Sequence, residues 1–207
     1  MSAIGLRRLG LIVALLLQTA LLKAALPTNP EEAPARPSLA GQLLVADPSM
    51  SDPYFERTVI LIVQHSPSGS VGIVINKPIG ETSIASLFEA LNQKGGDVAV
   101  RVFSGGPVQP EVGFVVHSSD YHRPETVAVN DRVSMTSSLD ILRDIGAKKG
   151  PAKILVAFGY AGWGPDQLER EIEAHGWAIA EADPALVFDE DRDKVWDHAW
   201  EHRTQNP

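Results

Sequence analysis

Ser104 is the residue whose type and position best fit a nucleophile in this 207-residue chain. It ends an apolar run and precedes Gly105 and Gly106, whose amides could in principle face an oxyanion. The segment lacks the G-x-S-x-G elbow, and the sequence identifies no base for the serine. Pro107 directly after the glycines indicates a rigid turn in which glycine supplies unusual backbone angles. We therefore expect a structural role and keep these residues as part of a candidate pocket.

His65 and His117 also end apolar segments, and strand ends in α/β sheets are where sites tend to form. A metal site would need a third ligand, for which Asp120 or His122 could serve, but no ligand spacing is recognisable. We expect each imidazole to hydrogen-bond to a neighbouring loop, and we predict no metal. The two histidines remain candidate pocket residues.

The segment "NKP" at residues 76–78 places a cation at the end of another apolar run. Lys77, with Asn76 beside it, could hold an anion. A strand that ends before Pro78 explains the same residues equally well. Asn76 and Lys77 therefore stay on the list of candidates.

The segment "HAWEH", from His198 to His202, matches H-x-x-E-H, in which two histidines bind zinc and a glutamate acts as base. It lies five residues from the end of the chain, and a helix tip is too exposed to exclude water from an active site. We therefore expect no catalysis there. Trp196 and Trp200, one helical turn apart, indicate instead that this helix is anchored on the body of the protein.

The segment "GYAGWG" at residues 159–164 joins an apolar run to a helical pattern. Its glycines do not follow the G-x-G-x-x-G order that seats a pyrophosphate on a helix start, so we predict no nucleotide site and no other cofactor. We expect a scaffold turn with unusual backbone angles at Gly162 or Gly164. Trp163 and Trp177 are expected to pack near the two ends of the following helix.

Alternating strands and helices must position these residues. β-Branched runs at 58–66 and 71–78, separated by "PSG", predict a hairpin. The run at 153–160 is almost continuously apolar, which predicts a strand covered on both faces. Further strands are expected in "VAVRVFS", in "VGFVVHS" and within "VAVNDRVSMT".

Three helices are predicted between these strands. The first spans 83–96, with a hydroxyl cap and a glycine stop, and the third lies between 165 and 176. The second spans 137–151 and begins with a capping-box spacing from Ser137 to Asp140. The pattern as a whole predicts one α/β (α+β) domain with helices beside a sheet.

Charge argues against direct nucleic-acid binding. The net charge is −8, and residues 1–39 carry four basic and two acidic residues, so the remainder carries −10. Such a body repels a phosphate backbone, and the acidic run at 189–197 has no basic counterpart of similar size.

Residues 1–38 differ from the rest of the chain. Two arginines precede the apolar run at 9–22, which has the length of a signal-peptide core and is short for a membrane span. We expect residues 1–26 to be a signal peptide or membrane anchor and residues 27–38 a Pro-rich linker, with the domain at 39–207. Export or anchoring in the inner membrane, with membrane contact through 9–22, is thus predicted, and the lack of cysteine fits it. A cytoplasmic location and a start codon assigned too far upstream are the alternatives.

Three segments together resemble the signature blocks of the YqgE/AlgH family of bacterial proteins. They are "GQLLVADPSMSDPYFERTVILIVQHSPSGSVGIVINKP", "FSGGPVQPEVGFVVH" and "LVAFGYAGWGPDQLEREIEAHGW", and the resemblance spans about residues 39–200. It implies a compact fold with a mixed, strongly curved sheet and flanking helices. It implies no reaction, because the family is of uncertain function and its transcription-regulator label derives from the AlgH name.

Two departures from the family pattern affect location. The apolar extension is unusual, because relatives begin near the "GQLL" block and are presumed cytoplasmic. Many relatives also carry a cysteine just before the histidine matched by His65, where this chain has Gln64. Loss of that thiol suits export.

Two classes of function follow from these residues. The first is a non-enzymatic binding or regulatory module for an unidentified protein or small molecule, which we favour because every motif has a structural explanation. The second is a small hydrolase or transferase that uses Ser104, His65 or His117 in a pocket at strand ends. Convergence of those three side chains would favour the enzyme.

Overall fold

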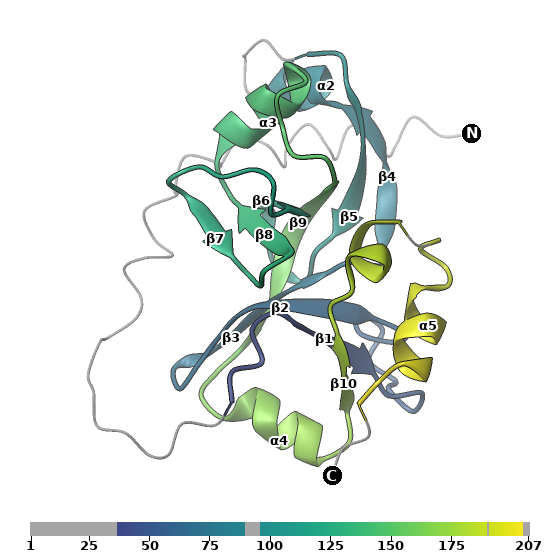
Figure 1. The fold of residues 1–207 in the computed structure, drawn as a ribbon. Helices are drawn as coiled ribbons and strands as arrows, with labels where there is room; N and C mark the ends of the chain where they lie inside the picture. The colour runs from purple at the N-terminus through teal and green to yellow at the C-terminus, as the bar shows by residue number, and fades with distance from the viewer. Residues whose placement is uncertain (1–36, 90–95, 190, 205–207) are drawn as a thin grey trace.

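The structure is a computed structural model that describes residues 37–89, 96–189 and 191–204 (Figure 1). The elements are, in chain order, β1 (Gln42–Ala46), β2 (Val59–Ser66), β3 (Gly69–Val74), β4 (Pro78–Ser83), α2 (Ile84–Glu89), β5 (Ala99–Ser104), β6 (Val108–Ser118), β7 (Thr126–Ala128), β8 (Val133–Thr136), α3 (Leu139–Gly146), β9 (Ile154–Trp163), α4 (Gln167–Glu173), β10 (Trp177–Glu181), the π-helix η2 (Ala185–Asp189) and α5 (Val195–Glu201).

The strands form one curled, mixed sheet, as predicted. Its order is β10-β1-β2-β3-β9-β6-β8-β7, and β4 joins through β5, which pairs with β9. The β5–β9 pair is parallel and the other pairs of described strands are antiparallel. Strand β9 is the centre of the fold, because its first half pairs with β5 and β6 and its second half with β3. The predicted fold class is therefore confirmed.

Helices cover the sheet at its two ends (Figure 1). Helices α2 and α3 pack on each other and on β5, β6 and the first half of β9. Helix α4 covers β1, β2, β3 and the second half of β9 at the other end. The largest cluster of buried side chains lies on the opposite faces of the strands and includes residues of η2 and α5.

Strand β9 is buried on both faces, as its continuous apolar sequence predicts. Leu155 and Ala157 belong to the largest cluster, whereas Val156 and Phe158 point into the cluster under α2 and α3. This alternation follows from the two-residue period of a strand. A single strand thus joins the cores of the fold.

The sequence "GYAGWG" is a continuation of β9 as far as Trp163, so the predicted turn is wrong for most of its length. The left-handed backbone lies at Gly159, with φ of 76°, and not at Gly162 or Gly164. A Cβ on Gly159 would lie 2.4 Å from the carbonyl oxygen of Gly106. Glycine is needed there because two chain segments cross in contact.

Other element boundaries differ from prediction by small amounts. Ser138 caps α3 by accepting from the amide of Asp140 at 3.2 Å, so the cap is one residue later than the predicted Ser137. Helix α2 is described as far as Glu89, and the rest of the predicted helix to 96 falls mainly on residues outside the description. Strand β10 was not predicted.

The predicted signal peptide or anchor at 1–26 and most of the linker at 27–38 lie outside the described residues. Within the described ranges, no helix has the length and hydropathy needed to cross a membrane.

Candidate functional site

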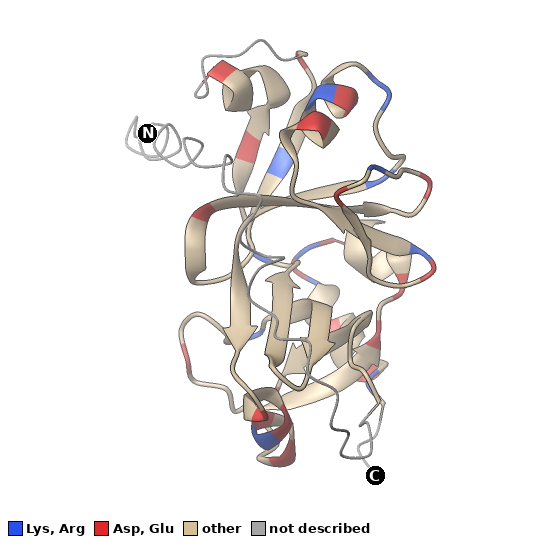
Figure 2. Cartoon of the chain, turned by 90° about the vertical axis from the view of Figure 1, so that its left-hand side faces the viewer, with Lys and Arg blue, Asp and Glu red and all other residues tan. Residues whose placement is uncertain are grey.

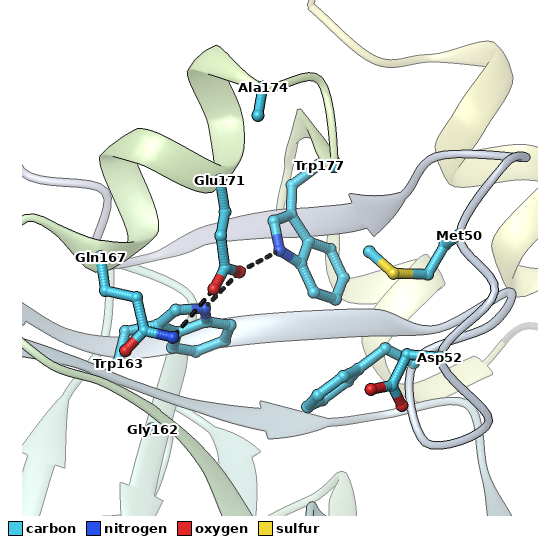
Figure 3. A pocket seen from close by; sticks show the side chains of 10 residues that line it. Met50, Asp52, Gly162, Trp163, Gln167, Glu171, Ala174 and Trp177 are labelled. Carbon is cyan, nitrogen blue, oxygen red and sulfur yellow. Dashed lines mark hydrogen bonds between the residues drawn. The ribbon is translucent and has the colours of Figure 1, made fainter.

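A surface pocket lies between α4, the end of β9, the start of β10 and the loop that joins β1 to β2 (Figure 3). Its volume is about 450 Å³, within the range of about 300–1,000 Å³ typical of small-ligand sites. We call it the tryptophan pocket, and it is lined by Met50, Asp52, Phe55, Gly162, Trp163, Gln167, Glu171, Ala174, Gly176 and Trp177.

Glu171 is the polar centre of the tryptophan pocket. Its Oε2 accepts hydrogen bonds from the indole N–H groups of Trp163 and Trp177, each at 2.9 Å. Its Oε1 accepts from the side-chain amide of Gln167 at 2.9 Å (Figure 3). One carboxylate therefore fixes two tryptophans and one glutamine.

The aromatic rings of the pocket pack edge to face. The rings of Trp163 and Trp177 have centroids 6.2 Å apart at 82°, and Phe55 meets Trp177 at 5.6 Å and 77°. These are favourable geometries for aromatic pairs. The two tryptophans lie toward the two ends of α4, as predicted, and they also meet each other on one glutamate (Figure 3).

Secondary structure explains how these residues meet. Helix α4 places Gln167 and Glu171 four residues apart on one face, while β9 ends at Trp163 and β10 begins at Trp177. Strand β10 pairs with β1 so that Trp177 lies opposite Ala46. The loop that follows β1 is therefore brought to the same place.

Asp52 organises that loop. Its Oδ1 accepts from the amide of Tyr54 at 2.8 Å, and its carbonyl accepts from the amide of Phe55 at 3.0 Å. Asp47 makes the same kind of side-chain turn five residues earlier, where its Oδ1 accepts from the amide of Ser49. Asp52 lines the tryptophan pocket, and Asp47 does not.

The lining of the tryptophan pocket carries negative charge. It includes the carboxylates of Asp52 and Glu171 and no lysine, arginine or histidine. The donors to Glu171 are neutral, and no ion pair of this carboxylate occurs among the residues that the structure describes. Helix α4, at the lower end of the molecule in Figure 2, carries three glutamates and one arginine.

Trp163 is both scaffold and lining. Only 7% of its surface is exposed, as expected for a scaffold residue, and its N–H is used by Glu171. It nevertheless contributes to the wall of the tryptophan pocket. Trp163 therefore serves both the buried core and the wall of the pocket.

Ser104 and its glycines are engaged in backbone pairing. The amide of Gly105 donates to the carbonyl of Phe158 at 2.7 Å, so it is not available to an oxyanion. The segment from Gly105 to Pro107 crosses β9 in close contact with it. Gly106 in this segment has a φ of 149°. These contacts give the segment a structural role.

Asn76 and Lys77 are also satisfied by the backbone. The side chain of Asn76 accepts from the amide of Val59 and donates to the carbonyl of Arg57, both at 2.9 Å. The ammonium of Lys77 donates to the carbonyl of Glu56 at 2.8 Å. Both side chains therefore hold the loop before β2.

His65 uses both ring nitrogens at the α4 end of the molecule. Its Nδ1 accepts from the amide of Leu39 at 3.0 Å, so Nε2 carries the proton and donates to Glu169 at 2.7 Å. The contact with Leu39 is the kind of loop contact that the sequence predicts, and the contact with Glu169 joins the same ring to α4.

His117 is completely buried at the α3 end of the molecule. Its Nδ1 lies 2.9 Å from the carbonyl of Ser118, which can only accept, so Nδ1 carries the proton and Nε2 accepts from the hydroxyl of Thr136 at 2.9 Å. Thr126 lies 2.7 Å from Thr136 and extends the chain. Burial lowers the pKa of His117 because the charged ring would lose its hydration.

Tyr121, Arg123 and Asp144 form a cluster beside His117 that the sequence did not reveal. Oδ2 of Asp144 accepts from the Tyr121 hydroxyl at 2.7 Å and from Arg123 at 2.5 Å. The Arg123 hydrogen bond, followed by that of Tyr121, lowers the pKa of Asp144, whereas burial and the Asp144 bond raise the pKa of Tyr121. The residues come from a loop and from α3, and no sequence spacing signals such a set.

The three candidates for catalysis lie apart. His117 is paired with Ile154 and Ser104 with Phe158, on opposite edges of β9. Four residues of strand separate these levels by about 13 Å. His65 lies on β2, which β3 separates from β9. The structure therefore does not bring a nucleophile and a base together from this set.

The "HAWEH" segment anchors a helix, as predicted. The indole N–H of Trp196 donates to the carbonyl of Ala46 at 2.9 Å, and its ring stacks on Trp200 with centroids 5.7 Å apart. His202 donates from Nδ1 to the carbonyl of His198 at 2.8 Å. No group of three or more His, Asp or Glu side chains suited to a metal occurs in the described part of the chain.

Comparisons with known proteins agree on one family. A family model described as AlgH-like matches residues 43–207. A UPF0301 protein from Cereibacter sphaeroides is 44% identical over 174 residues, which is 82% of this chain and 94% of the relative. One from a Jannaschia species is 46% identical over 165 residues, or 78% of this chain and 86% of the relative.

Two solved structures share the fold. The solution structure of the AlgH protein from Pseudomonas aeruginosa superposes with a TM-score of 0.69 at 35% identity, covering 84% of this chain and 92% of that protein. The crystal structure of protein DIP2367 from Corynebacterium diphtheriae gives 0.61 at 25% identity, covering 86% and 90%.

Proposed function

This chain belongs to the AlgH-like family, and we propose that it is a non-enzymatic binding module whose ligand site is the tryptophan pocket. The observation that carries the proposal is the pocket itself. It combines a volume suited to a ligand with aromatic walls and a few fixed polar groups, the usual composition of small-ligand sites.

The arrangement of the other candidates supports binding over catalysis. A small hydrolase or transferase built on Ser104, His65 or His117 would need a nucleophile and a base within hydrogen-bond reach. These residues lie on different strands, and both histidines already use both ring nitrogens. The partner in our proposal is a protein or a small molecule, because the charge of −10 after residue 39 disfavours nucleic acid.

A fragment screen by NMR tests the proposal. The full chain, labelled with ¹⁵N-tryptophan, is titrated with cationic, anionic and neutral fragments while the indole signals of Trp163 and Trp177 are followed. We expect saturable shifts from at least one class of fragment. Absence of any saturable shift of these signals would overturn the proposal.

A matched pair of variants makes the screen specific. Ala174 lines the tryptophan pocket at the end of α4, and the adjacent Glu173 is exposed outside it. Ala174→Phe fills the pocket and should abolish the shifts, whereas Glu173→Phe should leave them. Equal effects of the two variants would show that the fragments bind elsewhere.

Location remains a separate prediction. The arginine-flanked run at 9–22 predicts that the full chain is found in the membrane fraction or is exported. Cell fractionation tests this, and a full chain with an intact N-terminus in the soluble cytosolic fraction would contradict it.

A further inference from the structure

We infer that the tryptophan pocket takes a cationic group on an apolar stem, such as a primary ammonium at the end of an alkyl chain. The inference rests on the proposed function and names the class of ligand. Asp52 and Glu171 are the charged residues of the lining, so the pocket attracts a cation and repels an anion.

The hydrogen bonds within the pocket support a cation over a neutral polar group. Both indole N–H groups are already donated to Glu171, so neither Trp163 nor Trp177 can donate to a ligand. The wall therefore offers carboxylate acceptors and aromatic carbon, together with the second N–H of Gln167. An ammonium, which has donors and no acceptor, matches the carboxylates.

Within residues 37–89, 96–189 and 191–204, no ion pair balances the charge of Glu171. Its partners are two indoles and an amide, which stabilise a carboxylate by hydrogen bonding but bring no positive charge. A carboxylate that loses water when a ligand fills the pocket needs a cationic partner, because burial of an unpaired charge is costly. A neutral apolar ligand would impose that cost without compensation.

The apolar part of the lining suits the stem of such a ligand. Met50 and Phe55 are partly exposed beside the edges of the tryptophans. An alkyl chain buries apolar surface against these side chains while its charged end reaches a carboxylate. Aromatic faces near a cation add further attraction.

Asp52→Asn removes one charge with little structural change. An asparagine oxygen can still accept from the amide of Tyr54, as Asp52 does at 2.8 Å. Asp47→Asn is the matched control, because it removes the same charge from a similar turn outside the pocket. Net charge is thus equal in the two variants.

The experiment compares three ligands by NMR titration of the full chain. N-acetyl-lysine-N′-methylamide presents a peptide side chain, n-butylammonium presents the free amine, and N-acetyl-norleucine-N′-methylamide lacks the charge. We expect the lysine analogue to bind more tightly than the norleucine analogue. Asp52→Asn should weaken the lysine analogue about two- to fivefold, as for a partly exposed ion pair, and Asp47→Asn should not.

The ligand series also distinguishes two sources of the cation, a protein side chain and a free amine. Tighter binding of the lysine analogue than of n-butylammonium supports a protein side chain, and equal binding supports a free amine. Both results support the cationic class.

Other outcomes overturn the inference. If the lysine and norleucine analogues bind equally and Ala174→Phe abolishes the binding of both, the pocket binds ligands regardless of their charge. The inference then fails, and the proposed function stands. The same holds if only anionic or neutral fragments shift the indole signals. If no ligand or fragment shifts them, both fail.

Discussion

The two ends of the sheet each carry a carboxylate that gathers aromatic and polar side chains, but they differ in charge balance. On α3, Asp144 binds Tyr121 and the guanidinium of Arg123, so its charge is paired within the protein. On α4, Glu171 binds neutral donors and faces a pocket. The first arrangement is complete without a ligand, and the second leaves a charge for one.

The two ends of the sheet also differ in cavity size. The cavity beside α3, lined in part by Thr136 and Leu142, has a volume of about 20 Å³, which is enough for about one water molecule. The tryptophan pocket is about 450 Å³. Asp144 does not line the small cavity, whereas Glu171 lines the large one, and our proposal therefore assigns ligand binding to the α4 end.

Trp163→Ala should have the largest effect on stability. Truncation of a largely buried tryptophan costs about 3–5 kcal/mol, a large part of the 5–15 kcal/mol that holds a domain together. Thermal and denaturant unfolding measure this loss. Ser104→Ala and His198→Ala are comparison variants, for which we expect small losses of stability. An unchanged melting temperature for Trp163→Ala would show that Trp163 is not a scaffold residue.

The α3 end should respond to pH through His117. Its folded pKa lies below the ordinary value of 6.5, so its contribution to stability is complete above pH 6.5 and is lost as pH falls toward the folded pKa. The loss is up to about 1.4 kcal/mol per pH unit in that window. The neighbours Asp120 and His122 act on it in opposite directions.

Denaturant unfolding of the wild type and of His117→Gln between pH 5 and 7.5, roughly the window around an ordinary histidine pKa, checks this prediction. The difference between the two curves should change in that interval. Parallel curves would mean that His117 titrates alike in the folded and unfolded states.

Neutralising the two carboxylates should separate their roles in stability. Asp144→Asn removes the negative charge that pairs with Arg123 and should lower the melting temperature. Glu171→Gln keeps an oxygen for the indole donors and should lower it less. Differential scanning calorimetry measures both, and a larger loss for Glu171→Gln would assign that residue mainly to the scaffold.

Much of the fold is predictable because it is encoded locally. The β2–β3 hairpin, α3 and the anchoring role of Trp196 follow from short-range periodicity and turn residues. Strand β9 was predicted too short because glycine is typical of turns. Here Gly159 is required by a contact with Gly106, a segment more than fifty residues earlier that periodicity cannot place.

The tryptophan pocket was only partly predictable. Gln167 and Glu171 have helical i, i+4 spacing between two tryptophans, a local signal that could have identified the glutamate. Asp52 and Phe55 lie more than a hundred residues away and reach the pocket through the β1–β10 pairing. Long-range pairing of this kind leaves no trace in a single sequence.

The most direct test of the account is the affinity of the lysine analogue for three full-length proteins by calorimetry: wild type, Glu171→Gln and Asp144→Asn. The account predicts that Glu171→Gln weakens binding and that Asp144→Asn leaves it unchanged, because Glu171 lines the tryptophan pocket, whereas Asp144 lies outside it and is paired with Arg123. Equal affinity of the wild type and Glu171→Gln would contradict it.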